Sequence, residues 1–395
     1  MNVILYDINN IRENLLPLTF TRPIADIRFG ILTIKEKWQR YIAADQYSYI
    51  TADFLAPKFP TIADPNGDNL FIAGNIYPSE SLVAAINALP ADSALTFNDQ
   101  VIAYRGTHEC FNAGNYAEKT AYNNDNLLAI NWLYDIFMLD GRALNEDFDL
   151  ITAGRESAPL SNTCTVIGDP SRIFLEEGAT VEAANLNTKG GPIYVGHNAE
   201  IMEGACIRGA LALCEHAYIN MGTNVYGATT IGPYCKVGGE LNNVVMIGYS
   251  NKAHDGFLGN AVIGEWCNLG ADCVASNLKN DYSEIKLWNY PAHRFLRTGL
   301  QFCGLIMGDH SKAGINTMFN TATVVGVGCN IHGSGFPRNF IASFSEGGGA
   351  SGFTDVSLKK FYEIAQRAMA RRNIALTDTD IAIFDAIYDI AETYK

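Results

Sequence analysis

Several features that would place the chain in a common class are missing from it. None of its nine cysteines stands in a CxxC pair, so we expect neither a zinc site nor a disulfide framework and interpret the cysteines as reduced thiols of a cytoplasmic protein. No run of about 18 apolar residues occurs, so no membrane-spanning helix is expected. The opening MNVILYDINN has no basic segment followed by a long apolar one, so no signal peptide is expected.

Positive charge is also scarce. The chain holds 28 lysines and arginines against 42 aspartates and glutamates, which gives a formal net charge of −14. An acidic chain repels nucleic acid and anionic membrane surfaces, so neither is expected as a partner. A phosphorylated substrate would need a local basic site that works against this field.

Hydrophobic residues make up 48% of the 395 residues, enough for a packed core and for two or three domains. In the N-terminal part, apolar runs that read as strands alternate with segments that read as helices, which predicts a small α/β sheet over residues 1–118. The predicted strands are 2–6, 69–73 and 94–97, and the predicted helices are 30–42 and 79–88. Residues 119–165 are predicted to form a helical linker, with Trp132 and Phe137 on the apolar face of a helix over 119–140.

A six-residue repeat is the strongest pattern. Eight consecutive sixth positions are branched aliphatic: Val195, Ile201, Ile207, Leu213, Ile219, Val225, Ile231 and Val237. The step continues through Phe257, Ile263, Leu269 and Ala275, and again through Met307, Ala313, Phe319, Val325 and Ile331. Three such hexapeptides make one triangular coil, whose aliphatic residues point inward and bury a continuous column when coils stack. The repeat predicts a left-handed parallel β-helix over residues 166–341.

The six-residue repeat is interrupted twice, and after it the pattern changes to one typical of helices. Residues 249–257 contain two extra residues relative to the step, and 276–306 form a long insertion. Long excursions from a solenoid are typical places for function. Within 342–395, residues 355–371 and 377–394 predict two amphipathic C-terminal helices, the second opened by a Thr377-Asp378 cap.

The first interruption carries the candidate chemistry. It contains His254, one of seven histidines, within NKAHDGFLGNAVIGEWCNLGA at residues 251–271. Imidazole titrates in the range that a general base for acyl transfer to an amine requires. By position alone, His254 is equally well a polar loop residue.

The order and spacing of His254, Phe257, Asn268, Ala271 and Asn277 resemble the active-site stretch of the GlmU-like family, in which a hexapeptide-repeat acetyltransferase is fused to a sugar nucleotidyltransferase. The N-terminal LPLTFTRPIADIRFG segment is part of the same resemblance, which points to a Bacteroidetes-type branch. The resemblance implies acetyl-CoA as co-substrate and a cyclic trimer with active sites between subunits.

The resemblance also implies roles for single residues. His254 would be the catalytic base, with Asn268 and Asn277 as catalytic amides that orient the amine and the thioester. Gly270 and Ala271 would lie beside the coenzyme.

The chain departs from the family pattern where the acceptor would bind. Phe257, at the family's tyrosine position, has no phenolic hydroxyl. The family's basic residues that hold the sugar phosphate have no counterparts in residues 226–243. Lys252, Lys279 and Lys286 are the nearby cations that would replace them, unless they are solvated loop charges.

The N-terminal domain departs further. Nucleotidyltransferases of this class open with a strand and a glycine-rich loop that cradles the triphosphate, whereas here the first strand runs into YDINNIRENLLPLTFTRP, which has no glycine. Arg22, Arg28 and Lys35 form a cationic cluster that we expect to bind nucleotide phosphates. Asn75 replaces the acidic residue of the family's metal-binding pair, so the ligands of a Mg²⁺ ion remain unknown. The domain is either an altered nucleotide-sugar site or a degenerate domain kept for packing.

The sequence therefore predicts acetyl-CoA-dependent N-acetylation of an amino sugar phosphate, with glucosamine 1-phosphate as the expected acceptor. Uridylyl transfer from UTP, with Mg²⁺, would then give UDP-N-acetylglucosamine. One alternative is an acyltransferase acting on a nucleotide-linked amino sugar. The other is a non-catalytic trimer that binds nucleotide sugars.

Overall fold

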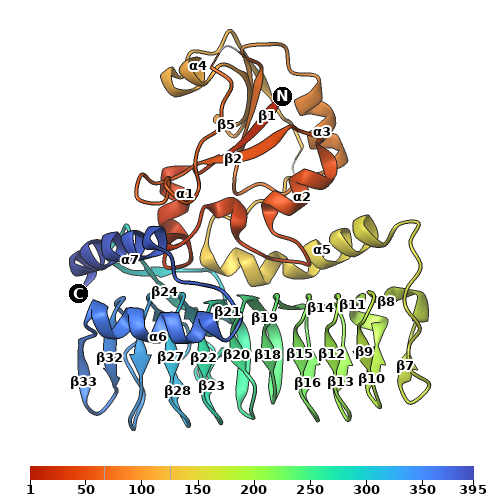
Figure 1. The fold of residues 1–395 in the computed structure, drawn as a ribbon, viewed down its shortest axis with the longest axis vertical. Coiled ribbons are helices and arrows are strands. Elements are labelled where there is room, and N and C mark those ends of the chain that lie inside the picture. The colour runs from red at the N-terminus through yellow and green to blue at the C-terminus, as the bar shows by residue number, and fades with distance from the viewer. Residues whose placement is uncertain (66, 125) are drawn as a thin grey trace. The chain divides into compact units, whose positions relative to one another are not determined.

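The computed structural model describes residues 1–65, 67–124 and 126–395, which form two compact units (Figure 1). The first unit comprises Met1–Leu15, Thr21–Ile27 and Leu32–Trp132. The second comprises Leu16–Phe20, Arg28–Ile31 and Leu133–Lys395. The domain boundaries that we infer from the sequence stay a prediction.

The first unit is a six-stranded sheet with strand order β2-β1-β3-β5-β4-β6. The strands are β1 (Asn2–Tyr6), β2 (Gln46–Ile50), β3 (Asn69–Ala73), β4 (Ser93–Phe97), β5 (Gln100–Gly106) and β6 (Glu118–Ala121). The helices are α1 (Asn9–Asn14), α2 (Ile34–Tyr41), α3 (Glu80–Asn87) and α4 (His108–Ala113). Strand β1 lies between β2 and β3 and is parallel to both, and β3 and β5 are antiparallel. This sheet confirms the α/β part of the predicted fold class.

Local capping explains where α2 begins. The hydroxyl of Thr33 accepts the backbone N–H of Glu36, and the Glu36 carboxylate accepts the backbone N–H of Thr33. This reciprocal pair satisfies two helix-start donors. The helix therefore begins at Ile34, four residues after the start predicted from the apolar pattern, and ends at Tyr41 as predicted.

The predicted helix over 119–140 is wrong in its first part. Residues Glu118–Ala121 form strand β6, which pairs in parallel with β4. Helix α5 begins only at Leu133 and continues to Thr152. Sheet pairing with a distant strand decided the conformation of this segment, and no local periodicity reports such a pairing.

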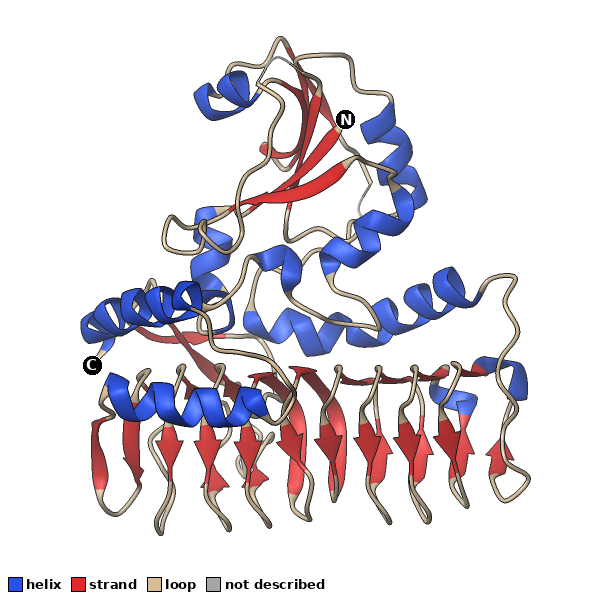
Figure 2. Ribbon diagram, in the orientation of Figure 1, coloured by secondary structure: helices blue, strands red, loops and turns tan. Residues whose placement is uncertain are grey.

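The second unit is built from stacked coils, and it confirms the predicted left-handed parallel β-helix. Figure 2 shows its short strands in red, one beside the next. One ladder contains β9 (Thr180–Val181), β12 (Glu200–Ile201), β15 (Tyr218–Ile219), β18 (Lys236–Val237), β20 (Asn251–Lys252), β22 (Asn268–Leu269), β27 (Lys312–Ala313), β30 (Asn330–Ile331) and β32 (Ser345–Gly348). Neighbouring strands in this ladder from β9 to β32 are parallel.

The other two edges of the coils share the long strands β19 (Glu240–Gly248) and β21 (Phe257–Glu265). One edge holds β7 (Thr165–Ile167), β10 (Asn185–Asn187), β13 (Cys206–Arg208), β16 (Asn224–Tyr226), and farther along β23 (Val274–Ala275) and β28 (Met318–Phe319). The other holds β8 (Ile173–Leu175), β11 (Ile193–Val195), β14 (Leu211–Leu213), β17 (Thr229–Ile231), β26 (Ile306–Met307), β29 (Val324–Val325) and β31 (Phe340–Ile341).

The repeat predicted the core of these coils correctly. The eight sixth-position residues from Val195 to Val237 are each at most 2% exposed. They belong to one hydrophobic cluster that runs on through Ile263, Leu269, Met307 and Ile331. Burial of this continuous column stabilises the stack, since no single coil could bury its aliphatic residues alone.

The first interruption is not an insertion, and that part of the sequence interpretation is wrong. Ile219 pairs with Val237 at the regular spacing of 18 residues. Val237 then pairs with Lys252, only 15 residues later, and Asn251 pairs with Asn268, 17 residues later. The coils here are shortened, and the inward position falls on Leu258 rather than on Phe257.

The second interruption and the C-terminal segment fold as separate elements. The long insertion contains an antiparallel hairpin of β24 (Lys286–Asn289) and β25 (Arg294–Arg297). Strand β33 (Gly352–Asp355) closes the last coil. Helices α6 (Leu358–Ala370) and α7 (Asp378–Ala391) follow, and α6 runs alongside the coils (Figure 1). Thr377 caps α7 as predicted. None of the described helices is long and apolar enough to cross a membrane.

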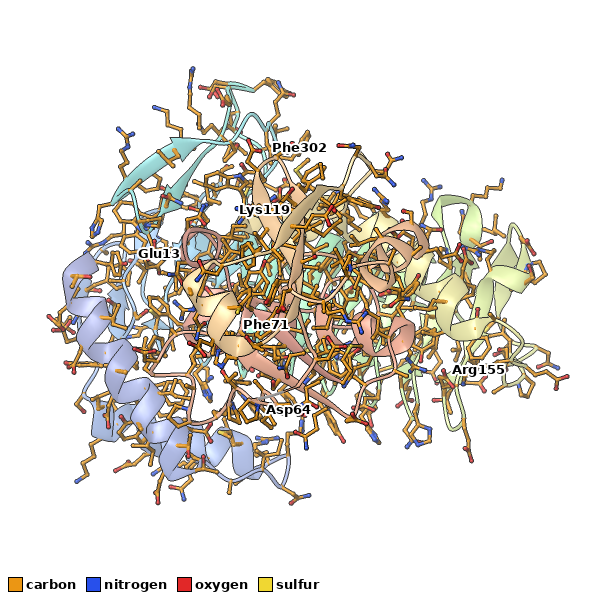
Figure 3. The ribbon with its side chains drawn as sticks, turned by 90° about the horizontal axis from the view of Figure 1, so that it is seen from above. Glu13, Asp64, Phe71, Lys119, Arg155 and Phe302 are labelled. Carbon is orange, nitrogen blue, oxygen red and sulfur yellow. The ribbon has the colours of Figure 1, made fainter. Side chains whose placement is uncertain are left out.

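Helix α5 anchors a short piece of the N-terminal chain in the second unit. The buried carboxylates of Asp140 and Asp147 accept the backbone N–H groups of Gly30 and Ile31 at 2.6 and 2.8 Å. Gly30 has φ +77°, and a Cβ there would lie 2.5 Å from Asp147 Oδ2, so only glycine fits. Beyond the end of α5, Arg155 (labelled in Figure 3) forms an ion pair with Glu176 beside the first coils.

A matched pair of substitutions tests the inward column. Ile219 is fully buried and Met221, two residues later, is 72% exposed. We expect Ile219→Ala to lower the free energy of unfolding of the second unit by about 2–5 kcal/mol, because it leaves a cavity in the column. Met221→Ala should change it by about 0.5 kcal/mol or less. Denaturant unfolding of both variants measures this, and equal effects would contradict an inward Ile219.

Candidate active site

Lys252 occupies an inward position that the repeat gives to an aliphatic residue. It follows Val237 and precedes Leu269 in the same ladder and is fully buried. Its ammonium group donates to the backbone carbonyls of Gly238 at 3.1 Å, His254 at 2.6 Å and Asp255 at 3.0 Å. These bonds satisfy all three donors, and burial lowers the pKa of Lys252. Lys252 therefore fixes the turn that carries His254, and its predicted role in binding the substrate stays a prediction.

His254 lies on this turn with an exposed side chain. Its backbone is held by Lys252, while its imidazole has no hydrogen bond to any described residue, so both ring nitrogens can meet a substrate. Two cavities adjoin it, and they share Ala253, His254 and Ala271 among their lining residues. An imidazole at the junction of two cavities can contact a ligand in either of them.

The larger cavity, which we call the donor cavity, has a volume of about 710 Å³. It lies between the coils from β18 to β27 and residues of α6 and its C-terminal end. Four residues that the sequence assigns to catalysis or coenzyme binding line it, namely His254, Asn268, Gly270 and Ala271. The structure thus brings these four residues together.

Coil register explains the polar floor of the donor cavity. Lys236 pairs with Asn251, Asn251 with Asn268, and Asn268 with Lys312. Each immediately precedes the inward residue of its coil, and side chains alternate between faces along a strand. The four side chains therefore follow one another along one outer face.

The donor cavity is strongly cationic. Lys236, Lys312, Arg371 and Arg372 line it, and the described residues of its lining include no aspartate or glutamate. The two arginines come from the C-terminal end of α6. These lysines and arginines form the local basic site that a phosphorylated ligand requires in this acidic chain, and the carboxylate of Asp309, outside the lining, interacts with Lys312.

Lys312 is held by backbone carbonyl groups. Its ammonium donates to the carbonyl of His310 at 3.1 Å and to that of Trp266. Burial lowers its pKa to about 8. Trp266 also stacks on Tyr249, with ring centroids 4.4 Å apart and planes 13° from parallel, so the cavity has an aromatic wall beside its cations.

The second cavity, which we call the small cavity, has a volume of about 300 Å³. Besides the three shared residues, it is lined by Asn220, Met221, Gly238, Gly239, Asp255 and Asp272. Its described lining contains two carboxylates and no lysine or arginine. The charges on the two sides of His254 are therefore opposite.

Two predicted residues lie elsewhere on the coils. Asn277 does not line either cavity, and its amide donates to Asn260 Oδ1 at 2.8 Å. Phe257 lies beside it, since a Cβ on Gly259 would meet both side chains within 3 Å. Six residues separate Asn277 from Ala271, which moves it to the next edge of the coil. The catalytic role of Asn277 and the substrate role of Phe257 stay predictions.

The predicted acceptor lysines of the insertion are also placed apart from the two cavities. Lys279 donates to the carbonyl of Glu284 at 3.0 Å. Lys286 is exposed on β24, directly opposite Arg297 on β25. Neither contributes to the described lining of either cavity.

The three cations predicted to bind a nucleotide do not form one group within the first unit. Arg22 is buried there, at 5% exposure. Lys35 pairs with Asp26 at 3.5 Å. Arg28 belongs to the second unit, where it donates to the carbonyl of Ile31. Their nucleotide-binding role stays a prediction.

The carboxyl ends of β1 and β3 meet where the first unit would hold a metal. Gly74 N donates to Tyr6 O at 2.8 Å, so Asp7 and Asn75 follow adjacent strand ends. The Asp7 oxygens already accept from Ile24 N and Thr51 Oγ1, and burial raises the Asp7 pKa to about 6. No group of three acidic, histidine or cysteine ligands occurs in the described residues. These residues do not fit a Mg²⁺ site built from paired carboxylates.

Sequence reasoning missed most of the donor cavity. Lys236 and Lys312 were detectable, because each immediately precedes an inward residue of the repeat. Asn251 required the true length of the shortened coil. Arg371 and Arg372 gave no signal, because their place depends on how α6 packs.

The N-terminal part of the chain matches a known protein family. Residues 3–156 match the family of sugar nucleotidyl transferases. The chain is 30% identical over 95 residues to the bifunctional protein GlmU of Methanocaldococcus jannaschii. That alignment covers 24% of this chain and only 22% of the relative, so the activities of the whole relative are proposals for this chain.

Three solved structures each have a low overall similarity to this chain. An Arabidopsis UDP-N-acetylglucosamine acyltransferase has 13% identity and a TM-score of 0.24, covering 59% of this chain and 95% of that one. The polySia-specific acetyltransferase NeuO has 14% identity and a TM-score of 0.21, covering 58% of this chain and 82% of that one. The UDP-N-acetylglucosamine acyltransferase of Francisella novicida has 10% identity and a TM-score of 0.21, covering 60% of this chain and 76% of that one.

The β-helix itself is defined by the parallel register of its strands. With a sugar nucleotidyl transferase match in its N-terminal part and a hexapeptide-repeat β-helix after it, the chain is similar to the GlmU-like family, as its sequence indicated.

Proposed function

We propose that the chain transfers an acetyl group from acetyl-CoA to the amine of an amino sugar. The observation that carries this proposal is the donor cavity, which has two lysines, two arginines, no carboxylate among its described lining residues, and His254 at its edge. Coenzyme A is a polyanion with a diphosphate and a further phosphate, and charge-assisted bonds from lysine and arginine suit these groups. Its adenine ring and pantetheine arm suit the Tyr249–Trp266 wall and the apolar side chains of Ile315 and Ile364.

The chemistry requires His254 as a neutral imidazole. The amine nitrogen attacks the thioester carbonyl, a C–N bond forms, and the C–S bond breaks with release of the CoA thiolate. Imidazole accepts the proton that the nitrogen loses and can return a proton to the thiolate. We expect the Asn268 amide, which lines the donor cavity from the neighbouring coil, to orient the thioester.

The identity of the acceptor and the second reaction follow from the resemblance. Glucosamine 1-phosphate is the acceptor that the resemblance implies, and the nucleotidyl transferase match over residues 3–156 supports uridylyl transfer from UTP as a second step. The rivals are acetylation of a nucleotide-linked amino sugar and a non-catalytic nucleotide-sugar-binding protein. A cytoplasmic cyclic trimer is part of the same proposal.

The central prediction concerns His254. We expect His254→Ala to lower acetyl transfer by about 10²–10⁴-fold, the usual contribution of a general base, and to leave the dissociation constant for acetyl-CoA within twofold or so. Release of the CoA thiol with amino-sugar acceptors measures the rate. His197→Ala is the matched control, since His197 is also exposed on the coils but lines neither cavity.

The same assay separates the rivals. Glucosamine 1-phosphate and a UDP-linked amino sugar are compared as acceptors, and UTP is then added while pyrophosphate is measured. A non-catalytic protein releases no thiol with either acceptor. Normal transfer by a folded His254→Ala variant would remove His254 from the mechanism.

A pH prediction follows from Lys312. Because its pKa lies at about 8, Lys312 loses its charge as the pH rises above 8, whereas the arginine of Lys312→Arg keeps its charge. Between pH 7.5 and 9.5, kcat/KM for acetyl-CoA should therefore fall about tenfold more in the wild type than in Lys312→Arg. The lowered pKa means that the unfolded chain binds this proton more tightly, so Lys312 makes folding more favourable as the pH rises from about 8 to about 10.4. Unfolding through this group therefore cannot cause the loss. Parallel pH profiles of the two proteins would contradict a role for Lys312 in binding the coenzyme.

A further inference from the structure

Three consecutive backbone carbonyls of the turn that carries His254 accept hydrogen bonds from two side chains. Asn220 Nδ2 donates to the carbonyl of Ala253 at 2.7 Å. The ammonium of Lys252 donates to the carbonyls of His254 and Asp255 at 2.6 and 3.0 Å. Side chains therefore hold this turn at each of the residues 253–255, in addition to the main-chain bonds between coils.

Asn220 reaches the turn across an intervening coil. Ladder pairing places Asn220, Gly238 and Ala253 at the same position of three successive coils, each directly after the inward residue. A Cβ on Gly238 would lie 2.5 Å from the carbonyl oxygen of Ala253. Because glycine has no side chain at this place, the Asn220 amide passes over the middle coil and bonds with the third.

Lys252 holds the same turn from inside the coils. Its side chain is fully buried, and its remaining N–H donor bonds with the carbonyl of Gly238 at 3.1 Å. The carboxylates of Asp255 and Asp272 interact favourably with its charge. A buried ammonium that lost its hydrogen bonds would be very costly. The carbonyl of His254 therefore cannot move away from Lys252 without a large loss of stability.

We propose that Asn220 and Lys252 are positioning residues for His254, which control the rate of acetyl transfer and not the affinity for the coenzyme. This inference rests on the proposed function, in which His254 is the base. The imidazole has no hydrogen bond to any described residue, so its place is set through its backbone. A base must lie within about 3 Å of the proton that it accepts, and a displacement of about 1 Å can lower the rate on the order of 100-fold.

Two substitutions in the full-length chain test this inference. Lys252→Met removes the ammonium and leaves an apolar side chain at an inward position, and Asn220→Ala removes the amide donor. We expect each to lower kcat about 10–100-fold and to leave KM for acetyl-CoA within about twofold, since neither residue lines the donor cavity. Asn224→Ala is the control, because Asn224 is exposed on the same coil as Asn220 and lines neither cavity. Wild-type kcat in both variants would overturn the inference.

Chemical rescue separates positioning from a general loss of structure. Lysine carries its ammonium on a four-carbon stem, so Lys252→Ala deletes three carbons and the ammonium, the same groups that n-propylammonium supplies. We expect n-propylammonium to raise kcat of Lys252→Ala about tenfold, whereas tetramethylammonium, a cation with no N–H donor, should not. The acetylated amino sugar is measured instead of the CoA thiol, because propylamine is itself an amine. Equal effects of the two cations would contradict the role of the Lys252 ammonium.

Amide hydrogen exchange keeps the test independent of the proposed function. We expect the backbone amides of residues 253–256 to exchange about tenfold faster in Lys252→Met and in Asn220→Ala than in the wild type, with the amides of β15 unchanged. This result supports a turn held by the two side chains even if no acetyl transfer is detected. Unchanged exchange in both variants would overturn the inference, while His254-dependent release of CoA thiol would still support the proposed function.

Discussion

Main-chain hydrogen bonding between successive coils is the constraint on which the second unit depends. It fixes which residue lies above which, so a spacing in the sequence becomes a column in space. The inward column is the aliphatic core from Val195 to Ile331. The residues immediately before it form outer columns, and one of these brings Lys236, Asn268 and Lys312 together. The same strand register therefore aligns both the inward core residues and the outward residues of the candidate site.

The shortening of two coils turns this regular scaffold into a site. It places Lys252 at an inward position, where an unpaired ammonium would be very costly. Three backbone carbonyls satisfy that ammonium, and two of them belong to His254 and Asp255. The stability of the buried charge and the position of the exposed histidine are therefore coupled. A substitution that removed the ammonium would release the turn as well.

Charge is separated around His254 in a way that the total charge does not reveal. The chain carries a formal charge of −14, yet the described lining of the donor cavity contains four lysines and arginines and no aspartate or glutamate. Burial of Lys312 strengthens its interactions relative to those of exposed surface charges, which salt screens within about 10 Å. A local cluster of four cations can therefore bind a polyanion despite the overall field.

The sequence by itself determined the features that depend on local period or local capping. The six-residue step gave the β-helix and its inward residues, and Thr377 marked the start of α7, because backbone spacing and nearby hydrogen bonds decide these features. The order of residues around His254 gave the centre of the candidate site.

Tertiary structure decided the rest. Residues Glu118–Ala121 are a strand because β4 is available to pair with them. Lys252 is inward because the coil before it is three residues short of the regular spacing, and Arg371 and Arg372 reach the donor cavity because α6 packs on the coils. Asn277 lies at another edge, bonded to Asn260. In each case the deciding contact joins segments far apart in the chain, and the free energy of that contact is not encoded in the residues of either segment alone.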